Sequence, residues 1–111
     1  MSINIVIWNA NGLSKHNLEV QSFLYTNNID ILLVSETHFS HRSYFNIQNY
    51  KTYHTLHPDG TAHGGTAVII KSSLKHIELK KYESEEIQAT RVEVVDHVGK
   101  LTVSALSQST K

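Results

Sequence analysis

Two apolar runs near the start of the chain each end abruptly at polar residues. The first run covers residues 3–9, finishes on Asn9 and leads to Asn11, and the second covers residues 30–35 and leads to Glu36. Both runs have the length and composition of buried strands. Because a strand, a helix-length segment and a second strand form a parallel unit, the polar residues after both strands are expected at the same edge of one sheet.

The segment between the two runs is expected to form a helix over residues 15–27. Apolar side chains recur there at helical spacing, and those expected to face a core are Val20, Phe23 and Leu24. Ser14 stands in the position of an N-cap residue. Leu13 and Leu18 are separated as in a hydrophobic staple, so the sequence predicts a capped helix start.

The rest of the chain predicts strands joined by turns. The expected strands cover residues 50–55, 66–71, 76–80, 87–94 and 100–106, which gives about seven strands and one helix in total. Residues 96–99 are expected to turn the last two strands into a hairpin. Alternation along the strand before this turn places four residues on one of its faces: Gln88, Thr90, Val92 and Val94.

The second apolar run is apolar on both faces and therefore needs cover on both sides of its sheet. One helix covers one side only, and we expect the other side to lie partly open to water. The residues expected to be exposed there are some of Val68, Ile70, Val92, Val94 and Val103. Such an apolar surface predicts marginal stability and self-association of the chain.

Composition and charge narrow the class of protein. The 111 residues form one domain or part of one, with 10 basic residues, 10 acidic residues and no cysteine. The zero net charge gives no support for tight, non-specific DNA binding, and the lack of cysteine excludes a disulfide framework or a thiolate metal site. No apolar stretch has membrane-spanning length and no secretory signal begins the chain, so we expect an intracellular protein, nuclear or cytoplasmic, with no membrane partner.

The polar residues after the two strands are the main candidates for chemistry. Glu36 follows apolar strand residues, and its carboxylate must leave the core or find a partner, because burying it alone is costly. Beside the amides of Asn9 and Asn11 it could hold a hard cation such as Mg²⁺, which takes oxygen ligands. Two other interpretations stay open: Glu36 as a solvated strand end, and residues 9–12 as a turn with left-handed backbone.

Three histidines, His54, His57 and His63, fall close together before the strand expected at residues 66–71. Imidazole is a common zinc ligand. However, their spacing does not match a pair on a helix or on a hairpin, and no cysteine assists. We therefore interpret this region as an exposed loop, either plain or lying near DNA, rather than as a zinc site.

Three short motifs stand out along the chain. Residues 8–13 read Trp-Asn-Ala-Asn-Gly-Leu, residues 35–38 read Ser-Glu-Thr-His, and residues 63–71 contain a Gly-Gly pair at the start of a strand. These motifs resemble those of the endonuclease/exonuclease/phosphatase superfamily. Their order and separation are most similar to those of the endonuclease domain of non-LTR (LINE-type) retrotransposons. The resemblance implies an α/β fold of the DNase I type. Residues 1–111 would form the N-terminal half of its four-layer sandwich, truncated after a first mixed sheet with one main helix.

The resemblance also implies a function. It is the Mg²⁺-dependent (Mn²⁺ possible in its place) hydrolysis of a DNA phosphodiester, nicking one strand, in a protein that also carries a reverse transcriptase domain. Asn9 and Glu36 would be catalytic residues and metal ligands, and Asn11 and His38 would bind the substrate.

Some of the family's motifs have no counterpart in this chain. Ser107 stands where the family has a tyrosine, and the later Asp-x-Asn and Asp-His motifs are missing. We therefore expect the isolated chain to be inactive. The alternative is a non-catalytic remnant or binding module that keeps only the first sheet.

Overall fold

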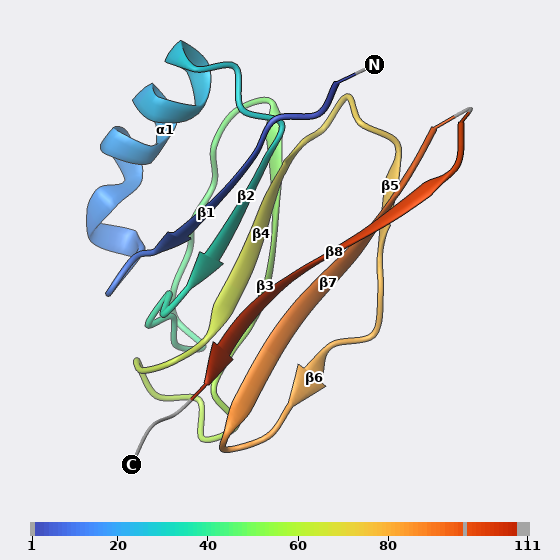
Figure 1. Ribbon diagram of the computed structural model, residues 1–111. Coiled ribbons are helices and arrows are strands. Elements are labelled where there is room, and N and C mark those ends of the chain that lie inside the picture. The colour runs from blue at the N-terminus through green and yellow to red at the C-terminus, as the bar shows by residue number, and fades with distance from the viewer. Residues whose placement is uncertain (1, 97, 109–111) are drawn as a thin grey trace.

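Two apolar strands, β2 (Ile31–Ser35) and β4 (Thr66–Lys71), form the centre of the first sheet. They run antiparallel, with β1 (Ile5–Asn9) parallel to β2 on one side and β3 (Tyr50–Thr55) antiparallel to β4 on the other (Figure 1). The parallel pairing of the first two strands, predicted from the sequence, is confirmed. This arrangement is that of a computed structural model, which describes residues 2–96 and 98–108.

The second sheet is built around a long hairpin of β7 (Ile87–Val95) and β8 (Lys100–Gln108). Two short strands, β5 (His76–Glu78) and β6 (Tyr82–Glu83), pair with the other side of β7. The described residues thus contain eight strands rather than about seven, because β6 has two residues and is too short to give an alternating pattern. The predicted turn lies between β7 and β8, and its residue His97 falls outside the described residues.

The helical segment differs from the prediction at its start. It begins as a 3-10 turn over Ser14–His16 and continues as α1 (Asn17–Thr26). No side-chain hydrogen bond caps either start, and Ser14 lies inside the 3-10 turn, so the predicted N-cap is wrong. The reason is local: the backbone of His16, with φ −113° and ψ 20°, leaves the helical region and restarts the helix one turn later.

α1 contacts the first sheet through a narrower face than predicted. Val20 and Leu24 are buried one turn apart, whereas Phe23 is partly exposed. Leu18 is 79% exposed while Leu13 is buried, so the predicted hydrophobic staple is wrong. Leu18 precedes Val20 by two positions, about 200° around an α-helix, and therefore points away from the sheet. No helix in the described ranges is long and apolar enough to cross a membrane.

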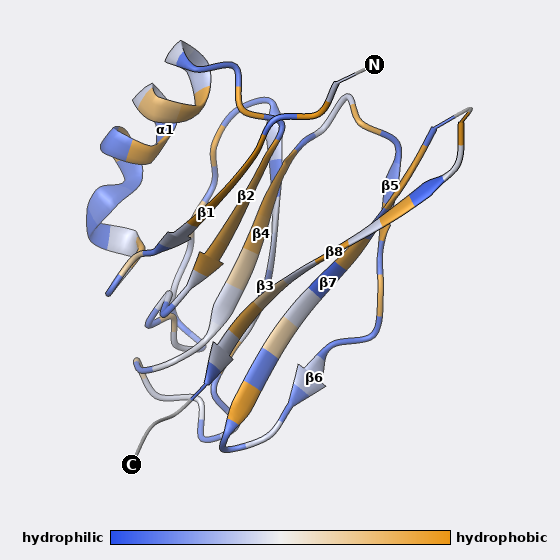
Figure 2. Cartoon of the chain, in the orientation of Figure 1, coloured by the Kyte–Doolittle hydropathy of each residue, from blue (hydrophilic) through white to orange (hydrophobic). Residues whose placement is uncertain are grey.

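The first sheet buries apolar side chains on both faces, and β1, β2 and much of β4 are correspondingly hydrophobic (Figure 2). One face packs against α1 through the strand residues Leu32, Val34, Ala67 and Ile69. The other face packs against the second sheet through Ile31, Leu33, Val68 and Ile70. Their partners on the hairpin are Val92, Val94, Val103 and Ala105. The result is a helix layer and two sheet layers with a core in each gap.

The predicted open face of the first sheet is therefore wrong. The five residues expected to be partly exposed are between 0% and 7% exposed: Val68, Ile70, Val92, Val94 and Val103. The cover is the β7–β8 hairpin, which crosses the first sheet face to face (Figure 1). The prediction considered only helices as cover for the first sheet. The inward face of β7 was not recognised as cover because it carries the polar residues Gln88 and Thr90 beside its valines.

Those polar residues make one end of the inter-sheet layer hydrophilic. The Thr90 hydroxyl lies 2.9 Å from the hydroxyls of both Thr55 and Thr66. The amide of Gln88, also fully buried, accepts the backbone N–H of Gly65 at 3.1 Å and donates to the Ser84 carbonyl at 2.7 Å. Because these buried groups are paired, the layer closes without the cost of stranded polar atoms. This polar end of the layer lies next to the last residues of β2 and β3, because Thr66 pairs with Ser35 and with Thr55.

The closed inter-sheet core gives a stability prediction. Ile70→Ala should lower the free energy of unfolding by about 2–5 kcal/mol, because it leaves a cavity between the sheets. Ile77→Ala removes the same atoms from a side chain that is 54% exposed and should cost less than about 1 kcal/mol. Urea unfolding of both variants measures the difference. Equal, small losses would mean that the hairpin does not cover this face in solution.

Candidate functional site

Backbone pairing continues past the ends of β1 and β2 and fixes the loops that follow. On one side, the N–H groups of Gly12 and Leu13 donate to the carbonyls of Glu36 and Thr37 at 2.9 and 2.8 Å. On the other side, the N–H groups of Thr37 and His38 donate to the carbonyls of Gly65 and Gly64 at 3.2 and 2.9 Å. We call residues 36–38 the clamped segment, since they lie between residues 12–13 and residues 64–65.

The backbone of the clamped segment and its neighbours is unusual. Glu36 and His38 have φ values of 54° and 56°, and Asn11 has a φ of 45°. This left-handed conformation costs a residue with a β-carbon roughly 1–2 kcal/mol. It persists here because the hydrogen bonds on both sides fix the chain. Local strain of this kind is typical of functional sites, where it aims side chains out of the sheet.

The structure brings the predicted site residues Asn9 and Glu36 into direct contact. Asn9 pairs with Ser35 in the β1–β2 register, which places Glu36 one position beyond. The Asn9 side-chain nitrogen donates to one carboxylate oxygen of Glu36, and its side-chain oxygen accepts the backbone N–H of Asn11 at 3.2 Å. Asn11 therefore joins the group through its backbone, in the left-handed turn that the sequence left open, while its side chain is exposed.

His38 and Lys15 complete this edge with basic groups. The His38 Nε2 atom lies 3.7 Å from the second carboxylate oxygen of Glu36. A β-carbon built on Gly12 would lie 3.6 Å from His38 Nδ1 and 3.7 Å from Lys15 Nζ, so both basic groups flank this glycine. Sequence reasoning missed Lys15, because the hydrophobic pattern of a helix start carries no signal for a lysine that reaches back over the preceding loop.

The edge thus combines one half-exposed carboxylate with an amide, an imidazole and an ammonium group. Of these, the Glu36 carboxylate is the group able to hold a hard cation. The basic groups of His38 and Lys15 suit an anion such as a phosphate. A cation and a phosphate could therefore bind next to each other here.

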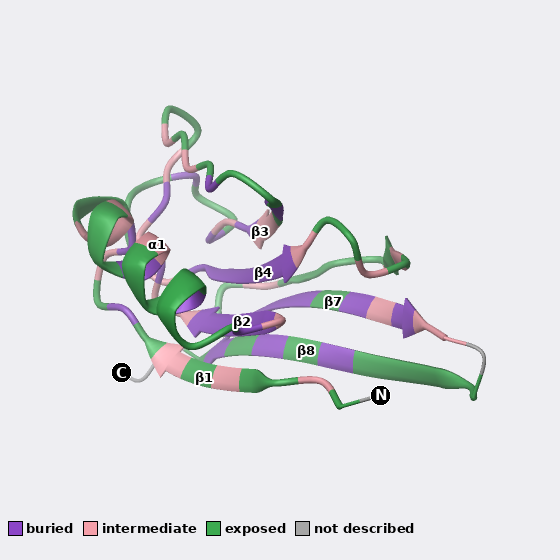
Figure 3. Cartoon of the chain, turned by 90° about the horizontal axis from the view of Figure 1, so that it is seen from above, coloured by how far each residue is buried: buried purple, intermediate pink, exposed green. Residues whose placement is uncertain are grey.

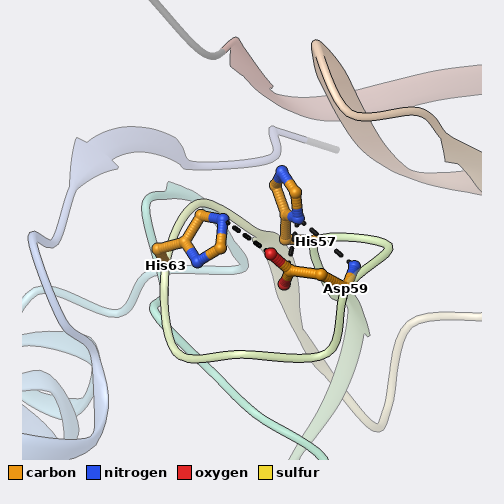
Figure 4. A group of neighbouring side chains, drawn as sticks. All are labelled: His57, Asp59 and His63. Atoms are coloured by element: carbon orange, nitrogen blue, oxygen red, sulfur yellow. Dashed lines mark hydrogen bonds and ion pairs between the residues drawn. The ribbon is translucent and has the colours of Figure 1, made fainter.

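The three histidines of the β3–β4 region have different surroundings, which their spacing in the sequence did not predict. His54 packs edge-on against Phe39, with ring centroids 5.6 Å apart, and burial lowers its pKa. His57 and His63 instead pack against each other with ring centroids 4.0 Å apart, and each contacts the carboxylate of Asp59 (Figure 4). His57 is buried whereas Asp59 and His63 are exposed, so the interpretation of this region as an exposed loop is wrong at His57 and holds at the other two residues. The loop folds back on itself, which brings together residues that no regular element would pair.

Sequence comparison identifies related proteins. The model of the endonuclease/exonuclease/phosphatase family matches residues 6–107. The RNA-directed DNA polymerase from mobile element jockey of Drosophila melanogaster is 38% identical over 105 residues, covering 95% of this chain and 12% of that protein. The probable RNA-directed DNA polymerase from transposon BS of the same species is 34% identical over 106 residues, covering 94% and 12%. The chain therefore spans about an eighth of the length of these relatives.

Solved structures share the fold. An AP endonuclease from Leishmania major superposes with a TM-score of 0.71 at 14% identity, covering 98% of this chain and 40% of that one. The endonuclease domain of TRAS1, a telomere-specific non-LTR retrotransposon, gives a TM-score of 0.64 at 14% identity, covering 98% and 46%. The predicted fold class, an α/β sandwich of the DNase I type with one main helix, is confirmed.

The clamped segment depends on the close approach of Gly65. A β-carbon at Gly65 would lie 2.7 Å from the Thr37 hydroxyl and 3.2 Å from the Thr55 carbonyl, at a φ of 82°. Gly65→Ala should therefore destabilise the fold by about 1–3 kcal/mol and shift the amide NMR signals of residues 36–38. Gly99→Ala is the control, since nothing lies within 4 Å of its added carbon. Unchanged signals at residues 36–38 in Gly65→Ala would contradict the clamp.

Proposed function

Because the chain belongs to the endonuclease/exonuclease/phosphatase family, we propose that it supplies the metal-holding part of an endonuclease domain that hydrolyses DNA phosphodiesters and nicks one strand. The observation that carries this proposal is the contact between Asn9 and Glu36 at the end of the first two strands. The names of its relatives favour a place beside a reverse transcriptase in a longer protein.

The donor set at this edge fits Mg²⁺ or Mn²⁺. Magnesium is commonly bound by one or two carboxylates, with water and substrate phosphate oxygens filling the remaining positions. We propose Glu36 as the ligand, with Asn9 fixing one of its carboxylate oxygens. Direct ligation by Asn9 stays a prediction, and it would require the Asn9 oxygen to exchange the Asn11 N–H for the ion. A bound ion would supply charge to the phosphoryl oxygens and the leaving group.

The neighbouring residues suit the phosphate of the substrate. Lys15 is an ammonium donor next to Gly12, and His38 presents an imidazole to the same space. We propose that both contact the DNA backbone, together with the exposed side chain of Asn11. Phosphate contacts of this kind position a nucleic acid without reading its sequence. The clamped segment would hold His38 at a fixed distance from Glu36, so that metal and phosphate are presented together.

We further propose that residues 1–111 are the N-terminal half of the domain. Within the described residues, β1 and β8 are each one of the edge strands of their sheet, and the two lie on the same flank of the sandwich (Figure 3). Ile7 on β1 is 80% exposed and Leu106 on β8 is 57% exposed. Unpaired edges with apolar side chains invite further strands. The other half of the domain would extend both sheets there, and self-association of the chain through this flank stays a prediction.

A binding module without catalysis is the second candidate function. The observation that favours it is the burial of Ser107, which pairs with Gln88 in the β7–β8 register. The family resemblance places a tyrosine at this position. With serine at this position, the chain has no tyrosine hydroxyl here that could contact the phosphate of a substrate.

Metal binding at the edge can be tested by NMR. Titration with Mg²⁺ should first shift the amide signals of residues 9–11 and 35–38, with weak affinity, because one carboxylate gives few charged ligands. Glu36→Gln should abolish these shifts, whereas Glu85→Gln, at an exposed site on another loop, should leave them unchanged. Equal shifts in Glu36→Gln would remove the assignment of this edge as the magnesium site.

Catalysis can be tested by complementation. The isolated chain should not nick supercoiled plasmid above background in Mg²⁺. The Asp-x-Asn and Asp-His motifs have no counterpart in it, and general acid–base groups typically raise the rate of hydrolysis by about 10²–10⁴-fold. Joined to the C-terminal half of the corresponding domain of the jockey relative, it should nick, and Glu36→Ala should abolish that activity. A joined, folded protein that binds DNA without nicking it would favour the binding module.

A further inference from the structure

We propose that His57, Asp59 and His63 form a binding site for a transition-metal ion such as Zn²⁺, separate from the Glu36 edge. The Asp59 carboxylate bridges the two rings, with one oxygen 3.1 Å from His57 Nδ1 and the other 3.3 Å from His63 Nε2 (Figure 4). One ligand atom from each residue can be chosen so that all three lie within 4.8 Å of one another.

These distances suit tetrahedral zinc. Zinc binds imidazole nitrogen and carboxylate oxygen at about 2.0–2.2 Å, which places neighbouring ligand atoms roughly 3.3–3.5 Å apart. The two nitrogen–oxygen separations at Asp59 are close to this value but involve different carboxylate oxygens, so binding of one ion through a single oxygen would need a small rotation of the Asp59 side chain. Three protein ligands would leave a fourth position for water. Two imidazoles with one carboxylate favour zinc, copper or nickel over magnesium, which takes oxygen ligands.

The loop presents these groups in a fixed arrangement. The backbone N–H and the hydroxyl of Thr61 donate to Asp59 Oδ1 at 2.9 and 2.8 Å, and the backbone bond holds the pKa of the Asp59 carboxyl below its ordinary value. The Thr61 hydroxyl also lies 2.7 Å from His63 Nδ1. Metal-bound histidines generally bond through their second nitrogen to such a partner, which orients the ring. Here that partner leaves His63 Nε2 directed at Asp59.

Burial differs across the three ligands in a way that suits an ion entering from solvent. The His57 side chain is 10% exposed, and its Nδ1 atom accepts the backbone N–H of Asp59 at 3.3 Å, a bond that an ion at Nδ1 would replace. The side chains of Asp59 and His63 are 47% and 49% exposed. An ion could therefore reach the open side of the group and close onto a ligand that is already anchored.

Metal binding here would also act on the clamped segment. The loop that contains His57, Asp59 and His63 leads directly into Gly64 and Gly65. The carbonyls of these glycines accept the N–H groups of His38 and Thr37. An ion that fixes the loop would fix these carbonyls. It would thereby stabilise the position of residues 36–38 without touching Glu36.

Zinc titration of the full chain, made without a histidine tag and freed of metal by a chelator, tests the proposal. Calorimetry should give one ion per chain, and NMR should show shifts confined to the ring signals of His57 and His63 and the amides of residues 36–38 and 57–65. Co²⁺ in place of zinc should give the visible absorption of a tetrahedral site. Zinc should also raise the unfolding temperature.

Variants separate this site from other histidines and from the Glu36 edge. His63→Gln should weaken zinc binding by at least about 100-fold, and Thr61→Val, which keeps all three ligands, by about 10–100-fold. His16→Gln, in the 3-10 turn before α1, and Glu36→Gln should leave it unchanged. Unaltered zinc affinity in His63→Gln, or no binding by the unmodified chain, would overturn the proposal and leave a hydrogen-bonded loop only.

Discussion

The candidate site depends on hydrogen bonds that the backbone makes after its strands have ended. Residues 36–38 pair with residues 12–13 on one side and with residues 64–65 on the other. Three segments that are distant in sequence therefore meet at one edge. Without this pairing, Glu36 and His38 would have no reason to adopt left-handed backbone, and the carboxylate would not be aimed at Asn9. The β2–β4 pair below supplies the rigid base from which this irregular ladder extends.

A buried polar cluster fixes how the second sheet sits beneath that edge. Thr90 on β7 contacts Thr55 and Thr66 through hydroxyl groups, and Gln88 accepts the N–H of Gly65. Apolar contacts alone would tolerate a shift of β7 along the first sheet by two residues. The hydroxyl pairs would not tolerate this shift, because each buried hydroxyl would lose its hydrogen-bond partner. The full free-energy cost of removing that hydroxyl from water would then destabilise the fold. The polar end of the layer thus sets the register, and the apolar end supplies most of the burial.

The sequence predicts those features that depend on regular repetition. The double-faced apolar run of β2 and the helix-length connection were enough to predict the parallel pairing with β1 and the meeting of Asn9 with Glu36. A feature that depends on one residue's backbone was not predictable: the break at His16 moved the start of the α-helix to Asn17. Nor was the inter-sheet core, since Gln88 and Thr90 gave the inward face of β7 a polar composition.

Loops were the least predictable part, because their shape follows no period. The group formed by His57, Asp59 and His63 depends on a turn in which the Gly60 N–H donates to the His57 carbonyl at 2.8 Å, with a Gly60 φ of 74°. The ladder at the edge has the opposite property, since its bonds join main-chain atoms and are indifferent to most side chains. Substitutions can accumulate around it while the geometry is inherited unchanged, provided that the glycines remain. Such an edge would allow the side chains that surround Asn9 and Glu36 to diversify while the backbone that positions them keeps its shape.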